Sequence, residues 1–374
     1  MGDWYTAGSI HYPVTPDLMS DFVHTRIAQR TGVITLDRPK ALNSLSLDMV
    51  RALTATLRAW RDDASIDAVV LTSSSPKALC AGGDIRFFYD HGRLTPTGGS
   101  ALIEDFFTEE YALNFLIHHY PKPYIALMDG VVMGGGMGIA QAGPVNRVRV
   151  VTERTKMAMP EVNIGLFPDV GGSYFLSRAP GYLGYYLALT GLTIGAADAI
   201  ATGLADVFVA QERMGELSAL IDATLGGGIR AAVMGFGTAP GESVLAANRG
   251  LIDRHFGAGS VPAIMQSLVH DSDPFAKAAL NAMQQRSPLM MCVTHAMLGR
   301  GANMEVADCL RMERNLVRRN FEHGEVLEGV RALVIDKDNA PRWNPATLDE
   351  VTPEMVEAFF KPAWPDYAHP LRDL

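Results

Sequence analysis

The chain has 374 residues, of which 48% are hydrophobic and 20% are charged, and this globular composition excludes a mainly disordered chain. The formal net charge of −9 argues against general binding to nucleic acid or to an anionic membrane surface. The three cysteines, Cys80, Cys292 and Cys309, form neither a disulfide framework nor a C-x-x-C metal pair, so we expect a reducing compartment.

The N-terminal residues do not form a basic segment followed by an apolar one, so no secretory signal is predicted. The longest weakly polar stretch, Val131 to Val145, is too short and too rich in glycine for a membrane span of about 20 residues. We therefore expect a soluble, cytoplasmic protein whose partners include neither a membrane nor a nucleic acid.

The predicted elements alternate between strands and helices up to about residue 210. A short apolar run predicts a strand over Val33 to Leu36. Helical spacing of apolar residues predicts a helix over Asp48 to Asp62, and Ala68 to Thr72 predicts the next strand. Strand, helix and strand in this order imply a parallel crossover. The later predicted elements are strands at 124–128, 147–151 and 206–209 and helices at 105–118, 183–190 and 195–202.

After about residue 210 the strand signal fades. Helices are predicted over Phe275 to Leu298 and over Asn303 to Arg319, and a proline-rich segment over Pro341 to Pro370 is expected to wrap a surface. The fold class is therefore α/β followed by a helical region. We expect an irregular N-terminal arm at 1–20, an α/β core at 21–210 and a helical C-terminal region at 211–374.

Two glycine clusters follow predicted strands, Ala81-Gly-Gly-Asp84 and Met133-Gly-Gly-Gly-Met-Gly138. Glycine allows the backbone to approach a ligand closely, and the second cluster opens a predicted helix, whose free N–H groups suit an anion or oxyanion. Each cluster is equally compatible with a tight turn that lets a helix pack closely on a strand.

A third segment, Pro160 to Gly172, places two carboxylates, Glu161 and Asp169, in an otherwise apolar loop. Such a pair can act as general acid and base beside a substrate. The structural alternative is that Glu161 lies in a first helical turn behind Pro160 and that Asp169 is the N-cap of a helix over Ser173 to Arg178. The spacing does not decide whether the two carboxylates face one point.

Several other chemistries are excluded by their missing motifs. The sequence has no G-x-S-x-G nucleophile elbow, no G-x-x-x-x-G-K-[ST] phosphate loop and no H-E-x-x-H zinc motif. A nicotinamide site is disfavoured because Gln141 stands where a dinucleotide loop counted from Gly136 needs its last glycine. The pair His118-His119 is isolated, so no metal site is predicted.

Taken together and in this order, the three segments resemble the crotonase (enoyl-CoA hydratase/isomerase) superfamily. The similar text begins at Gly32-Val-Ile-Thr-Leu-Asp-Arg-Pro-Lys-Ala-Leu-Asn43 and continues through both glycine clusters to Gly191. The resemblance implies a crotonase-like spiral of ββα turns that binds acyl-CoA thioesters. It also implies an oxyanion hole formed by the backbone N–H groups of Gly83 and Gly135.

One position separates the branches of this superfamily. Hydratases carry a glutamate three residues after the second oxyanion-hole glycine, and here that position is Gly138. The text around Glu161 and Asp169 is instead similar to the 3-hydroxyisobutyryl-CoA hydrolase branch, as is Glu328 to Asp338. That similarity implies hydrolysis of a short-chain 3-hydroxyacyl-CoA thioester, as in valine catabolism, with Glu161 and Asp169 as catalytic carboxylates. An enoyl-CoA hydratase or isomerase that uses Glu161 alone and a non-catalytic acyl-CoA-binding protein stay open as alternatives.

The resemblance also implies substrate contacts. Glu110 matches a substrate-contacting acid, and Gly135 contacts the substrate as part of the oxyanion hole. The positions that match those holding the adenine end of CoA are Ala41, Leu42, Ala81 and Asp84. CoA is part of the substrate, so we expect no separate cofactor, and a homo-oligomer is a candidate assembly. The preferred acyl group stays open, as does the choice of Glu161 as nucleophile or as general base.

Overall fold

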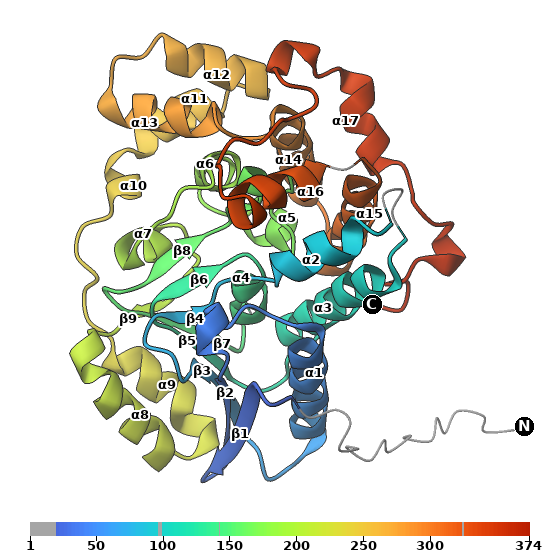
Figure 1. Cartoon of the computed structure of the whole chain (residues 1–374). Helices are drawn as coiled ribbons and strands as arrows, with labels where there is room; N and C mark the ends of the chain where they lie inside the picture. The colour runs from blue at the N-terminus through green and yellow to red at the C-terminus, as the bar shows by residue number, and fades with distance from the viewer. Residues whose placement is uncertain (1–19, 96–98, 142, 324) are drawn as a thin grey trace, which may run out of the picture.

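A computed structural model describes residues 20–95, 99–141, 143–323 and 325–374 (Figure 1). Of the N-terminal arm expected at 1–20, residues 1–19 therefore lie outside the described part. Described secondary structure begins with a strand, β1, that covers Val23–Ala28.

Two β-sheets form the first half of the described chain. The larger sheet has the strand order β1-β2-β3-β5-β7-β9, and the smaller has the order β4-β6-β8. β1 runs antiparallel to β2, and every other strand pair is parallel. The remaining strands are β2 (Thr31–Leu36), β3 (Ala68–Ser73), β4 (Ala78–Cys80), β5 (Tyr124–Met128), β6 (Val131–Met133), β7 (Arg147–Val151), β8 (Lys156–Ala158) and β9 (Val207–Phe208).

The chain climbs through these sheets as a spiral. Each of three turns adds one strand to the larger sheet and the next strand to the smaller one: β3 and β4, then β5 and β6, then β7 and β8. A helical segment follows each pair and leads to the next turn. Because every turn advances in the same direction, neighbouring strands are parallel. The expected ββα spiral is therefore confirmed.

The helices fall into two groups along the chain. Those of the spiral are α1 (Leu47–Asp62), α2 (Ile85–Gly92), α3 (Ala101–His118), α4 (Gly135–Ala140), α5 (Gly172–Phe175), α6 (Leu183–Thr190) and α7 (Ala196–Ala201). Those that follow it are α8 (Met214–Ala223), α9 (Gly226–Phe236), α10 (Val244–Ala247), α11 (Arg249–Phe256), α12 (Val261–Val269), α13 (Pro274–Met283), α14 (Pro288–Gly301), α15 (Val306–His323), α16 (Glu325–Val330) and α17 (Pro353–Phe360). Short 3₁₀ turns include η2 (Pro39–Ala41) and η3 (Glu161–Ile164).

One prediction about these elements needs correction. The single helix predicted over Phe275 to Leu298 is two helices, α13 and α14, because Pro288 cannot continue a helix and Ser287 caps the next one by accepting the Met290 N–H at 3.0 Å. The proline-rich segment near the C-terminus also contains a helix, α17, that was not predicted. The three-residue strands of the smaller sheet were not predicted, because so short a run carries no period.

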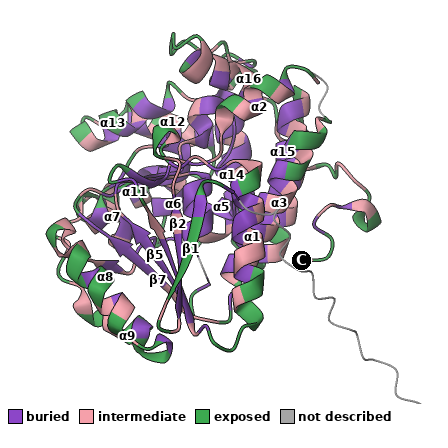
Figure 2. Cartoon of the chain, turned by 60° about the horizontal axis from the view of Figure 1, so that its bottom comes forward, coloured by how far each residue is buried: buried purple, intermediate pink, exposed green. Residues whose placement is uncertain are grey.

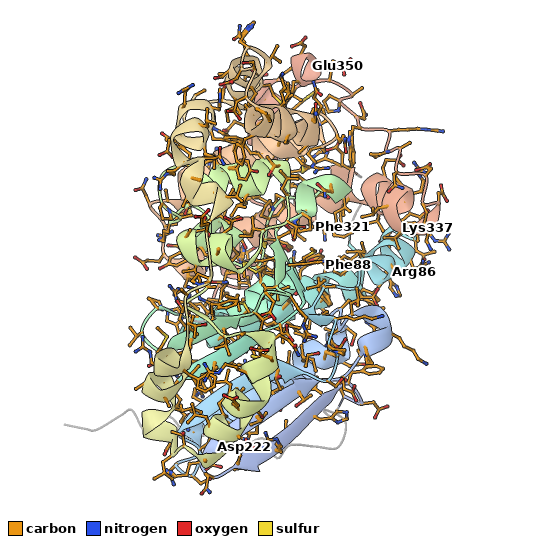
Figure 3. The ribbon with its side chains drawn as sticks, turned by 90° about the vertical axis from the view of Figure 1, so that its left-hand side faces the viewer. Arg86, Phe88, Asp222, Phe321, Lys337 and Glu350 are labelled. Atoms are coloured by element: carbon orange, nitrogen blue, oxygen red, sulfur yellow. The ribbon has the colours of Figure 1, made fainter. Side chains whose placement is uncertain are left out.

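One continuous hydrophobic core joins the spiral to the C-terminal helices. It contains buried residues from Val23 in β1 to Leu371 near the C-terminus. A smaller core lies between the larger sheet and the helices α8 and α9. Figure 2 shows the buried central strands and the exposed outer side of the edge strand β1. The edge strand's Arg26 forms an ion pair at 2.9 Å with Asp222 of α8, which Figure 3 labels.

The C-terminal helices cover the side of the spiral on which the glycine clusters lie. Phe88 of α2 and Phe321 of α15 pack edge to face with ring centroids 6.5 Å apart (Figure 3). α15 also contacts α3 and α5. The segment between β8 and α5, which contains Glu161 and Asp169, is therefore enclosed between the spiral and the C-terminal helices.

Candidate active site

The two predicted oxyanion-hole glycines lie next to each other. A Cβ atom at Gly135 would lie 3.3 Å from the backbone nitrogen of Gly83. Leu45 fixes the Gly83 turn, because its N–H donates to the Gly82 carbonyl at 2.8 Å and its carbonyl accepts the Asp84 N–H at 3.0 Å. Gly135 is the first residue of α4, where a helix leaves its N–H without an internal partner. Two backbone N–H groups thus face one small space.

Two glutamates border this space. A Cβ atom at Gly135 would lie 2.5 Å from Oε1 of Glu110, and one at Gly134 would lie 2.7 Å from Oε1 of Glu161. A Cβ atom at either position would displace a carboxylate, and the φ of +50° at Gly134 favours glycine there. Glu110 is 2% exposed and Glu161 is 6% exposed. The structure thus brings both acids next to the glycines predicted to form the oxyanion hole.

Asp169 joins the same cluster through a tyrosine. The hydroxyl of Tyr111, the residue after Glu110 on α3, donates to Oδ2 of Asp169 at 2.6 Å. The suggestion that Asp169 is an N-cap is wrong, because the N-cap of α5 is Gly171 and the Asp169 side chain turns to Tyr111 instead. The suggestion that Glu161 begins a helical turn behind Pro160 is confirmed by η3. Glu161 can begin this helical turn and still lie beside the predicted oxyanion-hole glycines.

A residue that the sequence reasoning missed holds the Asp169 loop, which we define as residues 165–171. Glu313 of α15 is fully buried and accepts the N–H of Gly171 at 2.8 Å and the N–H of Ser173 at 2.9 Å. Its Oε1 also accepts the Ser173 hydroxyl at 2.5 Å. The carboxylate that caps α5 therefore comes from a helix 140 residues further along the chain. The sequence does contain a sign of this role. Glu313 lies at helical spacing from Val306, Leu310 and Val317, so an acid interrupts the apolar face of α15.

The Asp169 loop carries backbone strain next to its acid. Val170 has a φ of +53°, a left-handed conformation that is costly for a β-branched residue. Its side chain fills the position that carries a glutamate in hydratases, because a Cβ atom at Gly138 would lie 2.6 Å from Cβ of Val170. The same atom would lie 2.8 Å from Nδ2 of Asn114. A side chain at position 138 would therefore collide with Val170 and Asn114 unless these residues moved.

Burial raises the pKa values of the clustered acids. The pKa values of Glu110 and Glu161 lie well above the usual range, chiefly through burial and then through the charge of Asp169. Burial also raises the pKa of Asp169 to about 6, although the Tyr111 hydroxyl lowers it. The pKa of Glu313 is raised to about 8 by burial. Strongly perturbed acids that share one enclosed space are typical of a catalytic centre.

The residues expected at the adenine end of CoA lie near the surface, next to the turn that contains Gly83. The Ala81 N–H donates to the Leu42 carbonyl at 3.0 Å, and Ala41 ends η2 directly before Leu42. The carboxylate of Asp84 is used locally, since it accepts the Phe87 N–H at 3.3 Å and pairs with Arg38 at 2.9 Å. The backbone of this group, more than the Asp84 side chain, is thus available to a ligand.

The described residues include no group of three or more His, Cys, Asp or Glu side chains arranged to bind a metal ion. Within the same part of the chain, no helix combines the length and the hydropathy of a transmembrane segment. All three cysteines are free thiols.

Comparison with known proteins agrees with this geometry. The family model described as enoyl-CoA hydratase/isomerase matches residues 31–360. The chain belongs to this family. It is 40% identical over 337 residues to the mitochondrial 3-hydroxyisobutyryl-CoA hydrolase of Xenopus tropicalis, covering 88% of this chain and 86% of that protein. The enzyme of the same name from Homo sapiens is 37% identical over 342 residues, with the same shares covered.

Two solved structures share the whole fold. A carnitinyl-CoA dehydratase from Mycobacterium thermoresistibile is similar with a TM-score of 0.86 and 41% identity, over 92% of this chain and 98% of that one. An enoyl-CoA hydratase from Rhodobacter sphaeroides is similar with a TM-score of 0.83 and 37% identity, over 91% and 98%. The crotonase fold expected from the sequence is therefore confirmed, including its C-terminal helices.

Proposed function

We propose that this protein is an acyl-CoA thioester hydrolase that acts on a short 3-hydroxyacyl chain, with 3-hydroxyisobutyryl-CoA as the substrate we favour. The observation that carries the proposal is the position of Glu161 beside the predicted oxyanion-hole glycines, close enough to Asp169 for that charge to raise its pKa, with Val170 and Asn114 occupying the space at Gly138 where a hydratase needs its second acid. The relatives named as 3-hydroxyisobutyryl-CoA hydrolases support the choice of substrate.

In this proposal the thioester carbonyl oxygen lies between the N–H groups of Gly83 and Gly135. When a nucleophile attacks the carbonyl carbon, an electron pair moves onto that oxygen, and each donor stabilises it by roughly 2.7–4 kcal/mol. The intermediate then expels the thiolate of CoA, which takes up a proton. Glu110, whose Oε1 approaches Gly135, contacts the acyl group at this point. The acyl transfer needs neither a metal ion nor a redox cofactor, and CoA enters as part of the substrate.

Glu161 supplies the attack by one of two routes. As nucleophile, its carboxylate forms a mixed anhydride that water then cleaves; as general base, it removes a proton from the attacking water directly. Burial favours either role, because a carboxylate whose pKa is raised is a stronger base than an exposed one. Asp169, held by Tyr111, orients the substrate hydroxyl or the water.

A second candidate function is hydration or isomerisation of an enoyl-CoA with Glu161 as the sole acid and base. The two similar solved structures, named as a dehydratase and a hydratase, favour it. A third is binding of acyl-CoA without turnover. Hydration by a pair of acids is disfavoured, since a side chain at position 138 would meet Val170 and Asn114.

One experiment separates the three. Purified protein is mixed with a panel of CoA esters, including 3-hydroxyisobutyryl, 3-hydroxypropionyl and enoyl esters, while free thiol and enoyl absorbance are followed in parallel. The proposal expects thiol release from the 3-hydroxyacyl esters with no enoyl change. Enoyl change without thiol release would establish the hydratase or isomerase, and tight binding with no turnover would establish the binding protein.

The proposal also covers the domain organisation of the chain and its cellular compartment. We infer an acyl-CoA-binding core at 21–210 and a helical region at 211–374 that completes the site through Glu313. The three free thiols suit a reducing compartment such as the cytoplasm, whereas the relatives named above are mitochondrial. Fractionation of cells tests the compartment. Light scattering of the purified protein tests whether the chain forms a homo-oligomer.

A further inference from the structure

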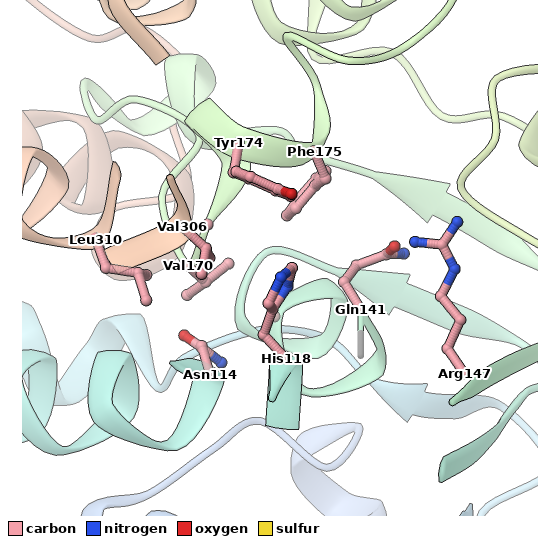
Figure 4. Close-up of a pocket in the computed structure, with 11 residues that line it drawn as sticks. Asn114, His118, Gln141, Arg147, Val170, Tyr174, Phe175, Val306 and Leu310 are labelled. Carbon is pink, nitrogen blue, oxygen red and sulfur yellow. The ribbon is translucent and has the colours of Figure 1, made fainter. Parts of the chain in front are cut away.

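A small cavity lies directly behind the Asp169 loop (Figure 4). Its volume is about 30 Å³, which exceeds the roughly 10–15 Å³ that one water molecule requires but leaves no room for an acyl chain. Asn114 and His118 of α3, Val170 of the Asp169 loop and Leu310 of α15 converge on it. Gly138 forms part of its wall. The cavity therefore borders both the position of the missing hydratase acid and the residue next to Asp169.

Asn114 is the unpaired polar group of this cavity. The residue is 5% exposed, and neither its Nδ2 nor its Oδ1 has a hydrogen-bond partner within the described chain. The amide of Gln141, which also lines the cavity, is instead engaged: its Nε2 donates to the Leu204 carbonyl at 3.2 Å and its Oε1 accepts from Arg149. A buried amide with both ends unpaired costs free energy, so it favours a small polar ligand that both donates and accepts.

The position of Asn114 on α3 connects the cavity to the oxyanion hole. Glu110, Asn114 and His118 are spaced by four residues and so share one face of the helix. Glu110 lies at the oxyanion hole, Asn114 lies one helical turn away beside Gly138, and His118 lies half-buried one turn further out. Burial lowers the pKa of His118 to about 4, so its ring is neutral near pH 7 and suits water rather than an anion.

We propose that this cavity supplies the hydrolytic water and that the Asn114 amide holds the attacking molecule beside Gly138. The inference rests on the proposed hydrolase function and adds the source of its second reactant. None of the residues expected at the adenine end of CoA lines the cavity, so the cavity lies outside the expected CoA site. Because Gly138 has no side chain, nothing at that position covers the Asn114 amide.

The chemical step balances as follows. The water oxygen forms a bond to the acyl carbon, and the bond from that carbon to its leaving atom breaks: the Glu161 oxygen if an anhydride has formed, or the CoA sulfur if water attacks directly. One water proton stays on the acid, and the other passes to a carboxylate of the Glu161 and Asp169 pair and ends, directly or through solvent, on the CoA sulfur. The products are the free acid and the CoA thiol. Asn114 keeps its protons throughout and acts through hydrogen bonds alone.

An isosteric pair of variants tests the proposal. Asn114→Thr and Asn114→Val have the same shape and both are β-branched, so they disturb α3 equally, but threonine alone keeps a group that hydrogen-bonds water. We expect kcat for thiol release from 3-hydroxyisobutyryl-CoA to be about tenfold higher in Asn114→Thr than in Asn114→Val, since one hydrogen bond is worth up to roughly that factor. KM should be the same in both, because neither variant touches the CoA moiety.

A second pair tests the route through the cavity. His118→Phe fills the outer part of the cavity and should lower kcat, whereas His119→Phe changes the neighbouring exposed residue, which does not line the cavity, and should leave kcat unchanged. Equal kcat values in Asn114→Thr and Asn114→Val overturn the water site, whatever the absolute loss. A wild-type protein that releases no thiol from any 3-hydroxyacyl ester overturns the hydrolase function itself, and the inference falls with it.

Discussion

Glu313 offers the sharpest test of how the C-terminal helices take part in the site. Its carboxylate accepts two backbone N–H groups and a hydroxyl at the end of the Asp169 loop, where Val170 is strained. In Glu313→Gln the side chain keeps its size but loses one accepting oxygen, so either the Gly171 or the Ser173 N–H is left buried and unpaired. Such a group costs about 1–3 kcal/mol, which is the loss of unfolding free energy we expect.

The same change should reduce catalysis through Asp169. Without the cap, the strained loop relaxes and moves the Asp169 carboxylate, and a displacement of about 1 Å can cost roughly 100-fold in rate. We expect kcat for thiol release to fall by at least about tenfold while KM changes little, because the adenine-end residues lie elsewhere. Urea unfolding and steady-state kinetics on the same preparation give both values.

The pH dependence of stability adds a second readout. Because burial raises the pKa of Glu313 from 4.5 to about 8, its contribution to stability is full below about pH 4.5 and is lost as the pH rises through about 8. That part of the pH dependence should disappear in Glu313→Gln.

A matched control is Asp271→Asn, which removes a carboxylate that accepts the Asp273 N–H at 2.8 Å between α12 and α13. It should lower stability without changing kcat. If Glu313→Gln loses stability but keeps its kcat, as this control does, the reasoning about the Asp169 loop is refuted.

Two further predictions concern the neighbours of Asp169. Tyr111→Phe removes the hydroxyl that donates to Asp169, so the pKa of that carboxyl should rise above about 6 by roughly one unit or more. The acid limb of the pH–kcat profile should then move to higher pH. If that limb does not move, ionised Asp169 has no role in catalysis. Gly138→Glu introduces the glutamate that hydratases carry at this position, but the new side chain meets Val170 and Asn114. We therefore expect the free energy of unfolding to fall by about 1–3 kcal/mol and no hydration of enoyl-CoA to appear. A gain of hydration would contradict the steric block at position 138.

Much of the site was predictable because its parts lie in short segments with strong local signals. The two glycine clusters and the Glu161 to Asp169 segment are punctuated by Gly and Pro, and the structure brings Gly83, Gly135 and Glu161 together as the resemblance implied. Glu110 was predicted through that resemblance alone, since on α3 it is one polar residue among several.

The rest was hidden because it depends on long-range packing. Glu313 reaches the Asp169 loop from a helix 140 residues away, and no local pattern links the two. Asn114 of α3 lies beside Gly138 of α4, and no local pattern in the sequence predicts that contact. The break at Pro288, in contrast, had a clear signal, because a serine followed by a proline is a common start of a helix.

The central claim, that the Glu161 carboxylate drives thioester hydrolysis, is tested most directly by Glu161→Gln. The variant keeps the side chain's size and removes its charge, so both its capacity as a base and its capacity as a nucleophile are lost. We predict that kcat for thiol release from 3-hydroxyisobutyryl-CoA falls by about 10²–10⁴ while CoA binding and the melting temperature are retained. A variant that keeps its kcat within about tenfold of the wild type would contradict the account.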